Sequence, residues 1–80
     1  MTTYNGHKNW NHWNVSLWIN NDEGLYNMAR QYARRYRNAG GKPYAAQAML
    51  NALTDCGVSK TPDGAPYSKS AIRAAMVGMD

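Results

Sequence analysis

Apolar side chains recur every three or four residues in four stretches of the chain, and this spacing predicts helices. The first stretch predicts a short helix with its large apolar residues on one side: Trp10, Trp13, Leu17 and Trp18. Asn11 is suited to cap the start of this helix, and Asn20-Asn21 is suited to end it. No segment of more than a few residues alternates apolar and polar positions, so we expect no β-strand.

The second stretch predicts the longest helix, over residues 22–39. Its apolar stripe is continuous and consists of Leu25, Met28, Ala29, Tyr32, Ala33 and Tyr36. Asn21 is suited to cap it, because Asp22 and Glu23 then lie in the first turn, where carboxylates complement the helix dipole. Gly40-Gly41 is expected to end the helix, since glycine readily adopts the left-handed conformation that closes one.

A third helix is expected to carry Pro43 in its first turn and to end at Gly57. Its inward-facing stripe is Ala46, Met49, Leu50 and Leu53. Residues 60–66 have the composition of a tight turn, in which Asp63-Gly64 supports a reversal of the chain.

The last helix has the clearest start in the chain. Ser68 is a good N-cap, and Tyr67 before it is placed to pack on Ile72 as a hydrophobic staple. Ala75 and Met76 are expected to face inward with Ile72, and Gly78 is expected to end the helix.

The four stretches together predict an all-α fold, a small single-domain bundle of four helices, the first short, spanning residues 1–80. Residues 1–9 are polar and lack a period, so we expect an irregular lead-in. Phe is absent and the second and third helices offer mainly Ala, Leu and Met, so we expect the tryptophans to fill the core. The alternative is that at least one tryptophan ring is exposed at a partner surface.

The composition excludes several classes of function. Cys56 is the only cysteine, so the chain forms no intrachain disulfide or thiolate cluster, and we expect this thiol to be partly buried. His7 and His12 lack metal-ligand spacing, and no phosphate loop or nucleophile motif is present. We therefore expect no metal, no cofactor and no enzymatic activity. The lack of a run of about 18 apolar residues predicts a cytoplasmic protein with no membrane partner.

The charge pattern favours an anionic partner. Nine Lys and Arg against five Asp and Glu give a net charge of +4, and the densest basic group is Arg30, Arg34, Arg35 and Arg37. We expect Arg30, Arg34 and Arg37 to share the helix face opposite the apolar stripe. A guanidinium pairs with phosphate or carboxylate through two parallel hydrogen bonds, which suits nucleic acid or an acidic protein. The alternative is a solvated face near a helix C-terminus, where cations are favoured anyway.

Residues 48–76 predict a helix, a loop and a helix, with Lys60, Lys69 and Arg73 around the start of the second helix. This segment is similar in outline to the helix–loop–helix in the DNA-binding region of large serine recombinases, where the helix helps to position DNA. The likeness implies phosphate contacts by Lys69 and Arg73. The alanines of this helix leave few side chains able to reach base edges.

Residues 9–26 carry a more specific pattern. The letters W-N-x-x-L-W-I-x-N-D-E-G-L-Y run from Trp13 to Tyr26, and Tyr4-Asn5-Gly6 precedes them. This pattern resembles the signature of a group of small phage and prophage proteins. The chain has His12 where that group often has an acidic or hydroxyl residue. The resemblance implies an accessory protein of a mobile element, a class that commonly binds host machinery and includes the anti-CRISPR proteins.

The leading hypothesis is an inhibitor that binds a host defence protein in the host cytoplasm. Its most concrete form is an anti-CRISPR that binds a Cas effector subunit and prevents the Cas complex from engaging DNA. The alternative is a small basic DNA-binding protein, such as a phage regulator.

In either case the expected partner-binding residues are Arg30, Arg34, Arg35, Arg37, Tyr36, Lys69 and Arg73, with Tyr26 or Tyr44 as further anchors. Homodimerisation is left open, and the face of Ala45, Ala48 and Ala52 is the candidate contact.

Overall fold

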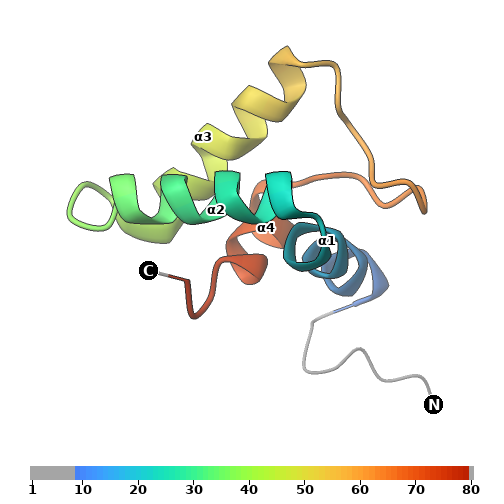
Figure 1. Ribbon diagram of the computed structural model, residues 1–80, viewed down its shortest axis with the longest axis horizontal. Coiled ribbons are helices and arrows are strands. Elements are labelled where there is room, and N and C mark those ends of the chain that lie inside the picture. Colours follow the sequence, from blue (N-terminus) through green and yellow to red (C-terminus); the bar gives the residue numbers. More distant parts are fainter. Residues whose placement is uncertain (1–8, 80) are drawn as a thin grey trace.

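The computed structural model describes residues 9–79, which fold into four helices and no sheet (Figure 1). The helices are α1 (Trp10–Asn21), α2 (Glu23–Arg35), α3 (Gly41–Asp55) and α4 (Lys69–Ala75). The predicted all-α fold of four helices is confirmed, although α4, with 7 residues, is shorter than α1, with 12. The lead-in predicted over residues 1–9 lies outside the described residues, apart from Asn9.

The helices pack as a ring in chain order. α1 packs against α2, α2 against α3 and α3 against α4, and α4 returns to pack against α1. The centre of the ring holds the largest fully buried side chains: Asn14, Val15, Ile19, Met49, Ile72 and Met76. α2 and α4 therefore lie across the ring from each other, with α1 on one side and α3 on the other.

The first two helices are capped one or two residues away from the predicted positions. Asn9, not Asn11, caps α1, because its extended backbone lets Oδ1 accept the N–H of His12 at 3.0 Å. The Asn11 side chain instead donates to the carbonyl of Pro66 at 3.2 Å. Likewise Asp22, not Asn21, caps α2 and accepts the N–H of Leu25 at 3.0 Å. α1 ends at Asn21, as predicted.

α2 ends at Arg35, earlier than the predicted residue 39. Tyr36 is its C-cap, and the chain turns over residues 36–40 before α3 begins. The N–H of Gly41 donates to the carbonyl of Tyr36 at 2.7 Å, and Gly40 and Gly41 both have positive φ. The glycine pair thus closes the reversal between two helices rather than the helix itself.

The second half of the chain follows the prediction closely. Pro43 lies in the first turn of α3, and Gly57 follows its end with a φ of 77°. Ser68 caps α4 through a 3.2 Å bond from the N–H of Ala71. Tyr67 and Ile72, the predicted staple pair, are both buried in the core. Burial, and secondarily the charge of Asp22, raises the pKa of the Tyr67 phenol above its ordinary value of 10.0.

The expectation that the tryptophans fill the core is wrong. α1 buries Val15 and Ile19, while Trp10 is 41% exposed and Trp13 and Trp18 are half-buried. Ile19 lies about 180° around the helix from Trp10. The faces that meet α1 and one another are rich in buried alanines: Ala29, Ala33, Ala45, Ala46, Ala71 and Ala75. Val15 and Ile19 form one core with these alanines, and the three tryptophans are not part of that core.

Two smaller expectations are also corrected by burial. Ala45 is fully buried against the core, so the face of Ala45, Ala48 and Ala52 is not available as a dimer contact in the form expected. Cys56 is exposed, because it caps the end of α3 that projects beyond the other helices (Figure 1).

Candidate binding surfaces

Arg30 and Arg34, two of the predicted site residues, share the outer face of α2. They line a shallow hollow with Asn27 and Gln31, and all four residues are exposed. The spacing of three to four residues places these side chains in one row along the helix. Each of them can donate hydrogen bonds, so this surface, the α2 arginine face, suits phosphate or carboxylate oxygens.

Arg35 and Arg37 do not join the α2 arginine face. Arg35 is the last residue of the helix, and Arg37 lies in the turn that follows. The expectation that Arg37 continues the helical row is therefore wrong, because the helix ends before it. Both side chains are exposed and add positive charge at this end of α2.

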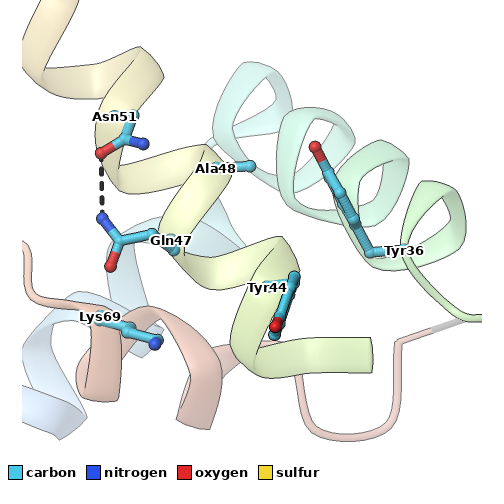
Figure 2. Close-up of a pocket in the computed structure, with 6 residues that line it drawn as sticks. All are labelled: Tyr36, Tyr44, Gln47, Ala48, Asn51 and Lys69. Carbon is cyan, nitrogen blue, oxygen red and sulfur yellow. Dashed lines mark hydrogen bonds between the residues drawn. The ribbon is translucent and has the colours of Figure 1, made fainter. Parts of the chain in front are cut away.

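Tyr36 and Lys69 line the same hollow, although 33 positions of sequence separate them (Figure 2). Tyr36 comes from the end of α2 and Lys69 from the start of α4, and α3 supplies the remaining lining residues: Tyr44, Gln47, Ala48 and Asn51. The hollow has a volume of about 380 Å³. Gln47 Nε2 donates to Asn51 Oδ1 at 3.0 Å along its wall.

Lys69 also lines a second hollow, of about 540 Å³, together with Arg73. Pro43, Ser68 and Ser70 complete its lining. The Ser70 hydroxyl lies 3.2 Å from His12 Nε2, which ties α4 to α1. The two predicted cations of α4 are therefore brought together, but this hollow shares no lining residue with the α2 arginine face.

α1 presents an apolar outer face that the sequence analysis assigned to the core. Trp10 is 41% exposed and Leu17 is 37% exposed, and Trp13 lies half-buried between them on the same side. We call Trp10, Trp13 and Leu17 the α1 outer face. An exposed tryptophan and an exposed leucine on one side of the helix make this face a candidate for protein contact.

One known family matches the chain over almost its full length. The profile of DUF7249, described as a family of unknown function, matches residues 1–79. The chain belongs to DUF7249. No curated protein and no solved structure matches it.

In this DUF7249 chain, the tryptophan–asparagine segment has a structural role that its sequence did not reveal. Asn14 Nδ2 and Trp18 Nε1 both donate to Oδ2 of Asp63, each at 2.9 Å. Asn14 Oδ1 accepts the hydroxyl of Thr61 at 2.6 Å, and that hydroxyl oxygen accepts the N–H of Ala65 at 3.0 Å. The buried Asn14 therefore fastens the turn at residues 61–65 onto α1.

These hydrogen bonds change the acidity of Asp63. Donation from Asn14, and secondly from Trp18, lowers the pKa of the carboxyl below its ordinary value of 3.8, because both bonds favour the charged form. A lowered pKa in the folded state contributes stability that is fully present above the unfolded value and is lost as the pH falls through the folded one.

We therefore expect the Asp63→Asn variant to have a lower melting temperature than the wild type at pH 7. The difference should shrink on acidification below about pH 4, where the wild-type carboxylate also becomes protonated. Thermal unfolding followed by circular dichroism between pH 7 and pH 2 measures this. Asp55→Asn, at the exposed end of α3, is the matched control. A difference that is constant over the whole pH range would contradict the role of the charge.

Sequence reasoning missed three parts of these surfaces. It did not name Gln47 or Asn51, although their spacing of four residues on a predicted helix indicated that they share a face. It also assigned no role to Asn14. A polar residue within an apolar stretch was the available signal, because such a residue needs a buried hydrogen-bond partner.

Among residues 9–79, no group of three or more His, Cys, Asp or Glu side chains is placed to hold a metal ion. His7 lies outside the described residues. Over the same residues, none of the helices has the length and apolar character needed to cross a bilayer.

Proposed function

We propose that the protein is an inhibitor encoded by a phage or other mobile element, and that it acts by binding a host defence protein in the host cytoplasm. In its most concrete form it is an anti-CRISPR that binds a Cas effector subunit and prevents the complex from engaging DNA. It acts by occupying a surface rather than by catalysis.

The α1 outer face is the observation that carries this proposal. The core is filled by Val15, Ile19 and the residues of the other helices, so the exposure of Trp10 and Leu17 does not serve folding. Tryptophan, tyrosine and arginine dominate the binding energy of protein interfaces. A small protein that keeps a tryptophan at its surface therefore has the composition of a binding module.

The charge of the protein narrows the kind of target. The α2 arginine face, Arg35 and Arg37 are all exposed, and the net charge is +4. Like charges across an interface are unfavourable, so the target surface is acidic or neutral rather than the basic channel that holds DNA. The inhibitor would thus block a subunit contact or a conformational step.

The test is a DNA-binding assay with purified Cas effector complexes of several types, each titrated with the protein. We expect one complex to lose DNA binding at close to one inhibitor per complex. Trp10→Ala should raise the concentration needed by at least about 30-fold, because a central tryptophan contributes about 2 kcal/mol or more. Val77→Ala is the matched control, since Val77 is an exposed apolar residue at the other end of the chain.

Two results would contradict the proposal. Inhibition that Trp10→Ala leaves unchanged would exclude the α1 outer face as the binding site. A panel in which no complex is inhibited would reject the anti-CRISPR form of the hypothesis.

A second candidate, a small DNA-binding protein, is favoured by the α2 arginine face. Asn27, Arg30, Gln31 and Arg34 form a row of hydrogen-bond donors that suits a phosphate backbone. If the protein binds DNA, its affinity for a duplex of about 30 base pairs should fall ten-fold or more between about 50 and 200 mM salt. The anisotropy of a fluorescently labelled duplex measures this affinity. The Arg30→Ala/Arg34→Ala variant should flatten that salt dependence.

A further inference from the structure

Tyr44 is an exposed aromatic ring that lies against the backbone at Gly40. Its side chain is 63% exposed, yet Gly40 lies against one face of the ring. A Cβ atom built on Gly40 would lie 2.4 Å from Cγ of the ring and 2.7 Å from both Cδ atoms, which places Gly40 above the ring plane. The ring is thus held on one side and open on the other, which is the arrangement of a stacking platform for a planar group.

The wall beside Tyr44 presents paired hydrogen-bonding groups. Gln47 and Asn51 lie one helical turn apart and are joined by the 3.0 Å bond from Gln47 Nε2 to Asn51 Oδ1 (Figure 2). That bond leaves Gln47 Oε1 as an acceptor and Asn51 Nδ2 as a donor. This acceptor and this donor lie at the two outer ends of the bonded pair, where each can hydrogen-bond a polar group of a base stacked on Tyr44 (Figure 2).

The second hollow carries positive charge, which suits an anion. Lys69 and Arg73 lie four residues apart on α4 and so share a face, with the hydroxyls of Ser68 and Ser70 beside them. The residues that line the two hollows include these two cations and no carboxylate. The two hydroxyls are already hydrogen-bonded within the protein, and the two cations suit a phosphate group, which carries up to two charges and three acceptor oxygens.

We propose that the two hollows form one binding site for a nucleoside 5′-phosphate. The hollows are adjacent because Lys69 lines both of them. The base stacks on Tyr44 against the carboxamide wall, and the phosphate lies between Lys69 and Arg73. The ligand is either a free nucleotide or an unpaired nucleotide at the end of a strand.

This site is separate from the surface that carries the proposed function. The α1 outer face contributes no residue to either hollow, and neither does the α2 arginine face. An acidic peptide with an aromatic side chain would satisfy the same groups only by joining two residues. A nucleotide carries the planar ring and the doubly charged phosphate in one molecule.

The test is a titration of ¹⁵N-labelled protein followed by amide NMR shifts, with AMP, adenosine and inorganic phosphate as separate probes. AMP should shift residues 44–51 and 68–73 and leave Arg30 and Arg34 unmoved. Phosphate and adenosine should each bind at least about ten-fold more weakly than AMP, because each fills only one hollow. An unstructured acidic peptide that contains tryptophan serves as the competing probe.

Variants separate the two halves of the site. Tyr44→Ala should lower the affinity for AMP by at least about ten-fold and leave the affinity for phosphate unchanged. Lys69→Ala should weaken both, whereas Lys60→Ala, which removes a lysine of the same charge outside the hollows, should weaken neither. Trp10→Ala should leave AMP binding intact, so failure of this site and failure of the proposed inhibitor are distinguishable.

A 5′-phosphorylated single strand of adenines identifies the source of the ligand. Binding at least about ten-fold tighter than AMP assigns the site to a strand end, and equal binding assigns it to a free nucleotide. The proposal is overturned if AMP shifts none of these residues, if Tyr44→Ala leaves AMP affinity unchanged, or if the acidic peptide alone produces the shifts.

Discussion

Replacing Asn14 by alanine is expected to lower the free energy of unfolding by about 2–3 kcal/mol. Asn14 is 2% exposed, and its amide is bonded through both ends, to Asp63 and to Thr61. The alanine variant removes both bonds and leaves the buried hydroxyl of Thr61 without its acceptor. The loss is a large fraction of the stability of an 80-residue domain. Chemical denaturation followed by circular dichroism measures it.

Asn51→Ala is the matched control for this prediction. Asn51 is an asparagine on another helix, exposed and bonded to the neighbouring Gln47, so its loss should change the stability by less than about 0.5 kcal/mol. Thr61→Val tests the other end of the bond and also removes the acceptor of the Ala65 N–H. The double variant should lose less stability than the sum of the two single variants, because each of them removes the bond between Asn14 and Thr61. Equal stability of the Asn14 and Asn51 variants would show that the network does not hold the turn.

Replacing Ile19 by alanine is expected to lower the free energy of unfolding by about 3 kcal/mol, while Trp10→Ala changes it by less than about 1 kcal/mol. Ile19 is fully buried at the centre of the ring, and its truncation leaves a cavity. Trp10 is the larger side chain, but 41% of it is exposed. The order of the two effects is opposite to the order of side-chain size.

Chemical denaturation of both variants checks this order. Ile19→Val provides a milder core change of about 1 kcal/mol if the alanine variant does not fold. If the Trp10 variant were less stable than the Ile19 variant, Trp10 would contribute more to folding than Ile19 does. The exposure of the α1 outer face would then not indicate a partner.

These expectations assign different tasks to the two faces of one helix. Val15 and Ile19 hold α1 to the rest of the protein, and Asn14 and Trp18 fasten the turn at residues 61–65 to it. Trp10 and Leu17 remain at the surface. Helix α1 therefore combines residues for folding with residues available for binding.

The sequence determined the helices and most of their inner faces, because these depend on local spacing. The apolar stripes of α2 and α3, Pro43 in the first turn of α3 and the Ser68 cap all follow from residues within one or two turns of each other. The sequence also placed Lys69 and Arg73 on one helix and Arg30 and Arg34 on another. None of these expectations required knowledge of the contacts between helices.

Only the tertiary structure decided which side of α1 faces inward and which distant residues meet. α1 is apolar on two sides, so spacing alone could not choose between Ile19 and the tryptophans. In the folded protein Val15 and Ile19 are the apolar α1 side chains that join the core, together with buried alanines of the other three helices. The bond between Asn14 and Asp63, and the hollow shared by Tyr36, Tyr44 and Lys69, join residues from different helices and loops. Such contacts depend on how the ring of helices closes, and no local pattern in the chain encodes that closure.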